Sequence, residues 1–291
     1  MQSIAFRTSF VSVGARKRSR TMGCRIAQCL RRSCIASAIA VYGITAHAAG
    51  QKPDGNQVDL GLVVTVDVSR PMDRDEAVVA RNGYVEAFRS PEFIQAIQQG
   101  SLGRIAVTFV EWSDPDVQIV VVPWTIINDS ASANNFADRL NRAPFQWLHG
   151  TSISGALLFS AGLIEKGEFK ARRWTIDVSG NGPNNVGLPV VSARDAVVAR
   201  GITINGLPID LGPREAVIEN LAEYYNACVI GGPGSFVTSV TEIDQLPVAI
   251  RRKLVQEIAM SGPNQGPMIK LIQAPSVDCM VGEKLQPSYS K

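Results

Sequence analysis

The stretch VDLGLVVTVDVS, residues 58–69, decides the fold. Its first nine residues are nearly all apolar and rich in valine, which predicts a strand buried on both faces. Such a strand belongs in the middle of a sheet that helices cover on both sides. Asp67 and Ser69 follow at once. They bring a carboxylate and a hydroxyl, two residues apart, to the edge where this strand ends.

The rest of the chain alternates between apolar and amphipathic runs. We expect further strands at 104–112, 117–124, 172–179, 202–209 and 235–240, and helices at 73–90, from 91 onward, and at 132–140, 151–167, 190–201, 213–227 and 243–259. The turn sequence Ser-Asp-Pro-Asp at 113–116 predicts an antiparallel hairpin. The fold class is therefore α/β, with a mostly parallel, doubly wound sheet, helices on both faces and one antiparallel edge hairpin. Binding groups in such sheets gather at the carboxyl ends of the strands.

The positive charge of the chain is concentrated at its start. Residues 1–48 hold eight Arg or Lys and no Asp or Glu, so the remainder has 29 − 8 = 21 basic residues against 26 acidic ones, a net charge of −5. A mildly acidic body argues against nucleic acid as a partner.

Residues 1–48 have the order of an export signal: Arg31-Arg32, an apolar stretch, and then Ala46-His47-Ala48 as a cleavage site. The apolar stretch is shorter than the ~20 residues of a membrane span, so we expect no stable span after signal removal. An anchor that stays in place is the alternative. We therefore expect a periplasmic or secreted protein with a signal peptide at 1–48, a linker at 49–57, one domain at 58–260 and an irregular tail at 261–291.

Two cysteines lie outside the expected signal, Cys228 and Cys279. In an oxidising compartment two thiols can pair, but sequence does not tell whether these two come close enough. There is no C-x-x-C motif, and His149 is the one histidine outside the signal, which argues against a zinc site of His and Cys.

Two further polar stretches stand where the expected elements begin or end. Gly150-Thr151-Ser152 opens a central helix, and Gly180-Asn181-Gly182 follows a central strand. Together with residues 58–69 and the phrases RIAVTFVEWS, HGTSISGAL, RRWTIDVSGNGPNN, ARDAVVARGITINGLPI and YYNACVIGGPGSFV, they resemble the von Willebrand factor A superfamily. The resemblance spans residues 58–260 and is closest to a bacterial exported branch of unknown function.

This resemblance implies a metal-ion-dependent adhesion site (MIDAS). The family pattern is Asp-x-Ser-x-Ser after the first strand, a Thr in a Gly-Thr loop and an Asp-Gly after the fourth strand. Carried onto this chain, it assigns Asp67, Ser69, Thr151 and Asn181 as oxygen ligands for Mg²⁺, or for Mn²⁺ or Ca²⁺, with an acidic side chain of a protein partner as the last ligand.

The chain departs from that pattern at two positions, so we expect a degenerate site. Pro71 stands where the second Ser belongs, and Asn181 stands where the branch has Asp. One hydroxyl and one negative charge are therefore missing. Strand alternation puts Asp177 on the same side as Ser179 and Asn181, where it can compensate; a buried structural Asp is the alternative reading.

Two other interpretations stay open. Ser69 and Pro71 also suit the start of a helix, with Ser69 as its cap, and the domain would then bind its partner without metal. A hydrolase built from Ser152 or Ser154 with His149 needs a third, orienting group that the sequence does not supply. We expect Glu111 to be exposed and Trp112 to be a packing residue at a strand end. Our prediction is a protein-binding module and not an enzyme.

Overall fold

The computed structural model describes residues 55–69, 74–145, 149–211, 218–260 and 277–285. All of them belong to one compact unit, Gln51–Lys291. The expected signal peptide at 1–48 and the position of Pro71 lie outside the described residues.

A five-stranded sheet forms the centre of the unit, in the order β4-β3-β2-β6-β7. Its strands are β2 (Leu60–Asp67), β3 (Ile105–Trp112), β4 (Gln118–Ile127), β6 (Trp174–Gly180) and β7 (Ile202–Pro208). All neighbours run parallel except β3 and β4, which are antiparallel. Every residue of β2 is buried, as expected for the middle strand of a sheet covered on both sides. The short strands β1 (Gln57–Val58) and β5 (Lys170–Ala171) pair separately.

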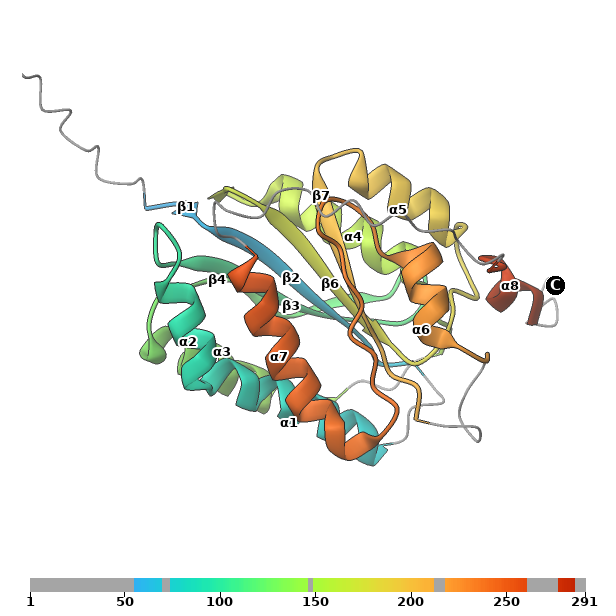
Figure 1. The fold of residues 1–291 in the computed structure, drawn as a ribbon, viewed down its shortest axis with the longest axis horizontal. Coiled ribbons are helices and arrows are strands. Elements are labelled where there is room, and N and C mark those ends of the chain that lie inside the picture. The colour runs from blue at the N-terminus through green and yellow to red at the C-terminus, as the bar shows by residue number, and fades with distance from the viewer. Residues whose placement is uncertain (1–54, 70–73, 146–148, 212–217, 261–276, 286–291) are drawn as a thin grey trace, which may run out of the picture. The chain divides into compact units, whose positions relative to one another are not determined.

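Helices cover both faces of this sheet (Figure 1). One layer contains α1 (Arg74–Arg89), α2 (Pro91–Gln98), α3 (Ser130–Arg142) and α7 (Leu246–Ala259). The other contains α4 (Ile153–Lys166), α5 (Val190–Val198), α6 (Leu221–Tyr224) and the π-turn η1 (Tyr225–Val229). Alternate β2 residues enter the two cores: Leu62 and Val64 pack towards α1, and Val63 packs towards α4. The predicted doubly wound α/β fold is confirmed.

The strand order also locates a switch point. From β2 the chain passes through α1 and α2 to β3 on one side, and from β6 it passes through α5 to β7 on the other. The gap between β2 and β6, at their carboxyl ends, is therefore where a ligand site is expected in an open α/β sheet.

Three segments differ from the sequence-based expectation. The helix expected at 213–227 begins, among its described residues, only at Leu221, because Asn220 adopts a left-handed conformation with φ 58°. The strand expected at 235–240 makes only isolated bridges, from Val237 to Gly206 of β7 and from Val240 to Ile209 just after β7. The tail expected to be irregular contains a helix, α8 (Val281–Leu285). No helix in the described residues is long and apolar enough to cross a membrane.

Candidate functional site

Asp67, Ser69 and Thr151 meet at the carboxyl end of β2. The Ser69 and Thr151 hydroxyl oxygens lie 3.1 Å apart, although the two residues are 82 positions apart in sequence. The Ser69 amide donates to Asp67 Oδ1 at 2.7 Å. All three side chains are buried. The alternative reading of Ser69 and Pro71 as a helix start involves residues 70–73, which lie outside the described residues.

The loop that carries Thr151 is held from two sides. The Thr151 amide donates to Asn185 Oδ1 at 2.9 Å, and the Asn185 amide donates back to the Thr151 carbonyl at 2.9 Å. On the other side, the Ser152 amide donates to the Ser113 carbonyl at the end of β3 at 2.7 Å. In the sequence Asn185 looks like an ordinary turn residue. No sequence pattern indicates that its side chain contacts Thr151.

Asn181 follows directly on a glycine that packs against Asp67. A Cβ at position 180 would lie 3.1 Å from Asp67 Oδ2 and 2.8 Å from the Tyr225 hydroxyl, so only Gly180 lets these groups approach each other. The Asn181 side-chain oxygen is buried and has no hydrogen-bond partner in the described structure. Tyr225 was not expected at this site, because it comes from η1, more than 150 residues beyond Asp67.

Asp67 is a buried carboxylate that has no positively charged partner among the described residues. Its Oδ2 atom is buried and without a hydrogen-bond partner, and no Lys, Arg or His among the described residues forms an ion pair with it. Burial raises the pKa of Asp67 to about 7, against a smaller lowering by its hydrogen bonds from Ser69. The Tyr225 hydroxyl is also buried and unpartnered, and burial raises its pKa well above the usual range.

Asp177 does not join this group. It lies in the middle of β6 and forms a buried ion pair with Lys253 of α7, which also donates to Glu257 at 2.6 Å. Its neighbour on the same side of the strand, Ser179, accepts a hydrogen bond from Tyr84 of α1 at 3.3 Å. Asp177 and Ser179 thus share a side, as predicted, but it is the side of α1 and α7, whereas Asp67 lies next to Tyr225 in the opposite layer.

The donor set at the end of β2 suits a hard divalent cation. Asp67, Ser69 and Thr151 bring one carboxylate and two hydroxyls together there, and Asp67 Oδ2 is buried without a partner. Asn181 Oδ1, from the residue after Gly180, is also buried without a partner. No cluster of three or more His, Cys, Asp or Glu side chains that could hold a metal occurs in the described ranges. Carboxylate and hydroxyl oxygens are ligands that hard cations such as Mg²⁺ prefer.

Other candidates from the sequence have structural partners. Ser152 caps α4 by accepting from the Gly155 amide at 3.1 Å, and it contacts the Ser154 hydroxyl at 3.3 Å. Within the described residues, no hydrogen bond joins either serine to His149. Glu111 was expected to be exposed; instead it is buried and paired with Arg81 of α1. Trp112 is fully buried, as expected of a packing residue.

The fold occurs in solved structures of low sequence identity. The pilus adhesin SpaC of Lactobacillus rhamnosus GG matches with a TM-score of 0.50 and 11% identity, over 69% of this chain and 30% of SpaC. The von Willebrand factor domain of the pilus tip protein Mfa5 of Porphyromonas gingivalis gives 0.49 and 11%, over 72% of this chain and 97% of that one.

A zinc-occupied MIDAS structure is also similar. Proximal thread matrix protein 1 of the mussel byssus gives a TM-score of 0.48 and 16% identity, over 70% of this chain and 48% of that protein. This chain thus spans about half of the matrix protein and about a third of SpaC. No curated protein matches the chain.

A family model matches residues 57–262, the whole of the sheet and its covering helices. The sheet order, the parallel strands with one antiparallel edge and the phrases of residues 58–260 agree with that match. The chain has the von Willebrand factor A fold and belongs to the family described as "Protein of unknown function (DUF1194)".

Proposed function

We propose that this protein is an exported, non-catalytic binding module that holds a partner protein through a divalent cation at the carboxyl end of β2. Asp67, Ser69, Thr151 and Asn181 would hold Mg²⁺ or Mn²⁺, and an acidic side chain of the partner would complete the site. The observation that carries the proposal is the Asp67 carboxylate, which is buried, has one oxygen without a partner and lies beside two hydroxyls 3.1 Å apart.

Each residue has a definite task in this account. Asp67 supplies the one negative charge, and the Ser69 amide fixes its orientation through Oδ1, which leaves Oδ2 free to face a ligand. Ser69 and Thr151 supply hydroxyl oxygens, and Asn185 holds the Thr151 backbone in place. A bound divalent cation supplies a positive centre with an open position for a carboxylate. With Pro71 and Asn181 in place of Ser and Asp, we expect weaker cation affinity than the full family pattern would give, because one hydroxyl and one negative charge are missing.

A groove next to the site offers additional surface to a partner. It measures about 530 Å³ and lies between the start of β4, the first turns of α4 and the loop before α5. Its lining is mostly apolar and includes Leu158 and Phe159, with the hydroxyls of Ser152 and Ser154. Leu188 at its rim is 56% exposed. Because Ser152 directly follows Thr151, a partner anchored at the site can also bury this apolar surface.

The adhesion role agrees with the name of SpaC, a pilus adhesin. The 11% identity to SpaC means that this agreement concerns the fold alone. The chemistry of the role therefore depends on Asp67 and its neighbours.

A pull-down from extract of the source cells tests the proposal. Immobilised protein from residue 49 onward is incubated with 5 mM Mg²⁺ or with a chelator, and Asp67→Asn is the matched control because it removes the charge but keeps the shape. We expect proteins retained by the wild type with Mg²⁺ to be lost with chelator and with Asp67→Asn. Equal retention in all three conditions would overturn the metal-dependent account and favour a metal-independent interaction domain.

A further inference from the structure

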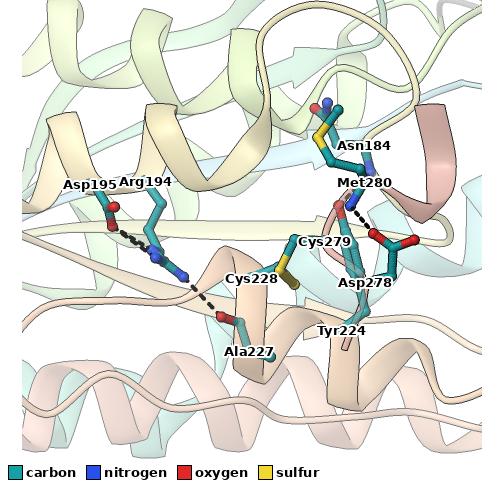
Figure 2. The surroundings of a disulfide bond; sticks show 9 residues. All are labelled: Asn184, Arg194, Asp195, Tyr224, Ala227, Cys228, Asp278, Cys279 and Met280. Carbon is teal, nitrogen blue, oxygen red and sulfur yellow. Dashed lines mark hydrogen bonds and ion pairs between the residues drawn. A yellow bond between two sulfur atoms is a disulfide. The ribbon is translucent and has the colours of Figure 1, made fainter. Parts of the chain in front are cut away.

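A disulfide joins two segments far apart in sequence, on the side of the molecule that carries α6 and α8. Cys228 of η1 and Cys279 are bonded, with their Cα atoms 5.6 Å apart, although the two residues are 51 positions apart in sequence (Figure 2). Cys228 is fully buried. The bond anchors residues 277–285, including α8, against the body of the domain.

The anchored segment rests on the loop that follows β6. A Cβ at position 282 would lie only 2.2 Å from the Asn184 carbonyl oxygen, so Gly282 permits close packing of α8 against that loop. Beside it, Glu283 Oε1 accepts a hydrogen bond from Asn184 Nδ2 at 2.8 Å. Figure 2 shows Asn184 beside Met280 and Tyr224, close to the disulfide.

Asn184 connects α8 to α4, because it forms hydrogen bonds with residues of α4, α6 and α8. Its side-chain oxygen Oδ1 accepts from the Ser154 amide at 2.9 Å, and its backbone amide donates to the Tyr224 hydroxyl at 3.1 Å. Its Nδ2 is shared between Glu283 and the Leu188 carbonyl. Asn184 is itself fully buried. A buried amide with these partners has one orientation, because a flip would place donor against donor.

The next residue completes the path to the candidate site. Asn185 exchanges two hydrogen bonds with Thr151, whose hydroxyl lies 3.1 Å from Ser69. A continuous series of contacts therefore runs from Cys279 through Glu283 and Asn184–Asn185 to Thr151. Such outer partners of ligand residues usually set the ligand orientation and alter metal affinity when they are removed.

We infer that the disulfide-anchored segment 277–285 is a brace that sets the position of the Thr151 loop, with Glu283 and Asn184 as its positioning residues. Its effect on cation affinity rests on the proposed function, whereas its effect on the loop does not. Removing the Glu283 contact leaves the Asn184 side-chain amide with the Leu188 carbonyl and the Ser154 amide as its partners and so loosens it. The Ser154 and Thr151 amides then open more often without unfolding of the sheet.

Hydrogen exchange in the metal-free protein and a Mn²⁺ titration test the brace together. We expect Glu283→Ala to speed exchange about tenfold in peptides covering 150–155 and 184–188, with β2 and β3 unchanged, and to weaken Mn²⁺ binding about tenfold. Glu283→Gln keeps an acceptor oxygen for Asn184 and should behave as wild type. Lys284→Ala, an exposed neighbour in the same helix, is the matched control.

The double variant Cys228→Ser with Cys279→Ser should raise exchange in the same two peptides at least as much as Glu283→Ala. Unchanged exchange in Glu283→Ala would overturn the brace, and so would a Glu283→Gln variant as perturbed as Glu283→Ala. If the wild type binds no Mn²⁺ while exchange responds as expected, the brace stands and the proposed function fails. If the wild type binds Mn²⁺ and exchange does not respond, the brace fails and the proposed function stands.

Discussion

Two buried aspartates on adjacent strands of this sheet have opposite surroundings. Asp67 ends β2 and Asp177 lies in β6; both are about 1% exposed, and burial raises the pKa of each to about 7. Asp177 is paired with the buried ammonium of Lys253, whose own pKa is held up by Asp177 and Glu257 against the lowering by burial. Asp67 has only the Ser69 hydrogen bonds to offset its burial.

The difference separates a structural carboxylate from one open to a ligand. The chain supplies a countercharge for Asp177 from α7, the Lys253 ammonium, although Asp177 Oδ2, like Asp67 Oδ2, is buried without a hydrogen-bond partner. Among the described residues nothing supplies a countercharge for Asp67, and a buried charge without one is unfavourable unless it is protonated or bound. The comparison therefore predicts that removing the partner of Asp177 destabilises the fold, while removing the charge of Asp67 abolishes cation binding without destabilising the fold.

The largest effect is expected from Lys253→Met. This change keeps most of the side-chain volume but leaves Asp177 and Glu257 buried together without the ammonium that pairs with both. We therefore expect a loss of about 3–5 kcal/mol in the free energy of unfolding at pH 7. Urea unfolding followed by circular dichroism measures it. Lys284→Met, at an exposed ion pair, is the control and should change stability by less than about 0.5 kcal/mol. A Lys253→Met loss as small as the control's would contradict the structural role of the cluster.

The second effect is a gain in stability from Asp67→Asn in the metal-free protein. In the unfolded chain Asp67 loses its proton near its ordinary pKa of 3.8, whereas in the folded protein it keeps the proton until about pH 7. Folding stability therefore falls as pH rises from about 4 to 7, by up to about 4 kcal/mol, and the Asp67→Asn variant is expected to escape this loss.

We accordingly expect Asp67→Asn to be more stable than the wild type by about 2–4 kcal/mol at pH 8, and equally stable near pH 4. Asp177 titrates in both proteins, so its contribution cancels from the difference. Urea unfolding at several pH values in the presence of a chelator gives the comparison. A variant less stable than the wild type at pH 8 would mean that the charge of Asp67 is compensated within the protein.

A third, smaller effect is stabilisation of the folded protein by Mg²⁺, which we expect to depend on Asp67. At pH 8, 10 mM Mg²⁺ should stabilise the wild type by about 1–3 kcal/mol, through binding to the folded state alone, and should leave Asp67→Asn unchanged. Thermal unfolding with Mg²⁺ and with chelator measures the shift, and 30 mM NaCl controls for ionic strength. An equal shift in both proteins would place the cation elsewhere.

The smallest effect is expected from Thr151→Val, which keeps the shape but removes the hydroxyl that faces Ser69. We expect Mn²⁺ affinity to fall about tenfold, equivalent to about 1.4 kcal/mol, with little change in the metal-free stability. Calorimetry detects it, and Thr125→Val, on the edge strand β4, serves as the control. Undiminished affinity would remove Thr151 from the ligand set.

Local patterns in the sequence were sufficient for most of the fold. The nearly continuous apolar run at 58–66 identified the central strand. The helix expected from 91 onward does begin at Pro91, where Ser90 accepts from the Phe93 amide at 3.3 Å. The pattern failed at 213–227 and 235–240. In the first of these, the helix begins only after Asn220, which has a left-handed conformation. In the second, residues 235–240 form only isolated bridges and no strand.

The candidate site could be predicted only as far as strand ends and loop starts can be read from sequence. That reasoning singled out Asp67 and Ser69, and the resemblance to the von Willebrand factor A superfamily assigned Thr151 to the same site. Alternation correctly put Asp177 and Ser179 on one side of β6, but it could not show that Lys253, 76 positions later, occupies that side. The roles of Asn184 and Asn185 depend on contacts with α4 and α8 that only the folded chain creates.

Isothermal calorimetry with Mn²⁺ at pH 8 tests the central claim most directly. The account predicts one cation bound per molecule of wild-type protein and no binding heat for Asp67→Asn, with Lys284→Ala unchanged. A wild type that shows no binding heat would contradict the assignment of Asp67 as a cation ligand. An Asp67→Asn variant that binds as the wild type does would contradict it as well.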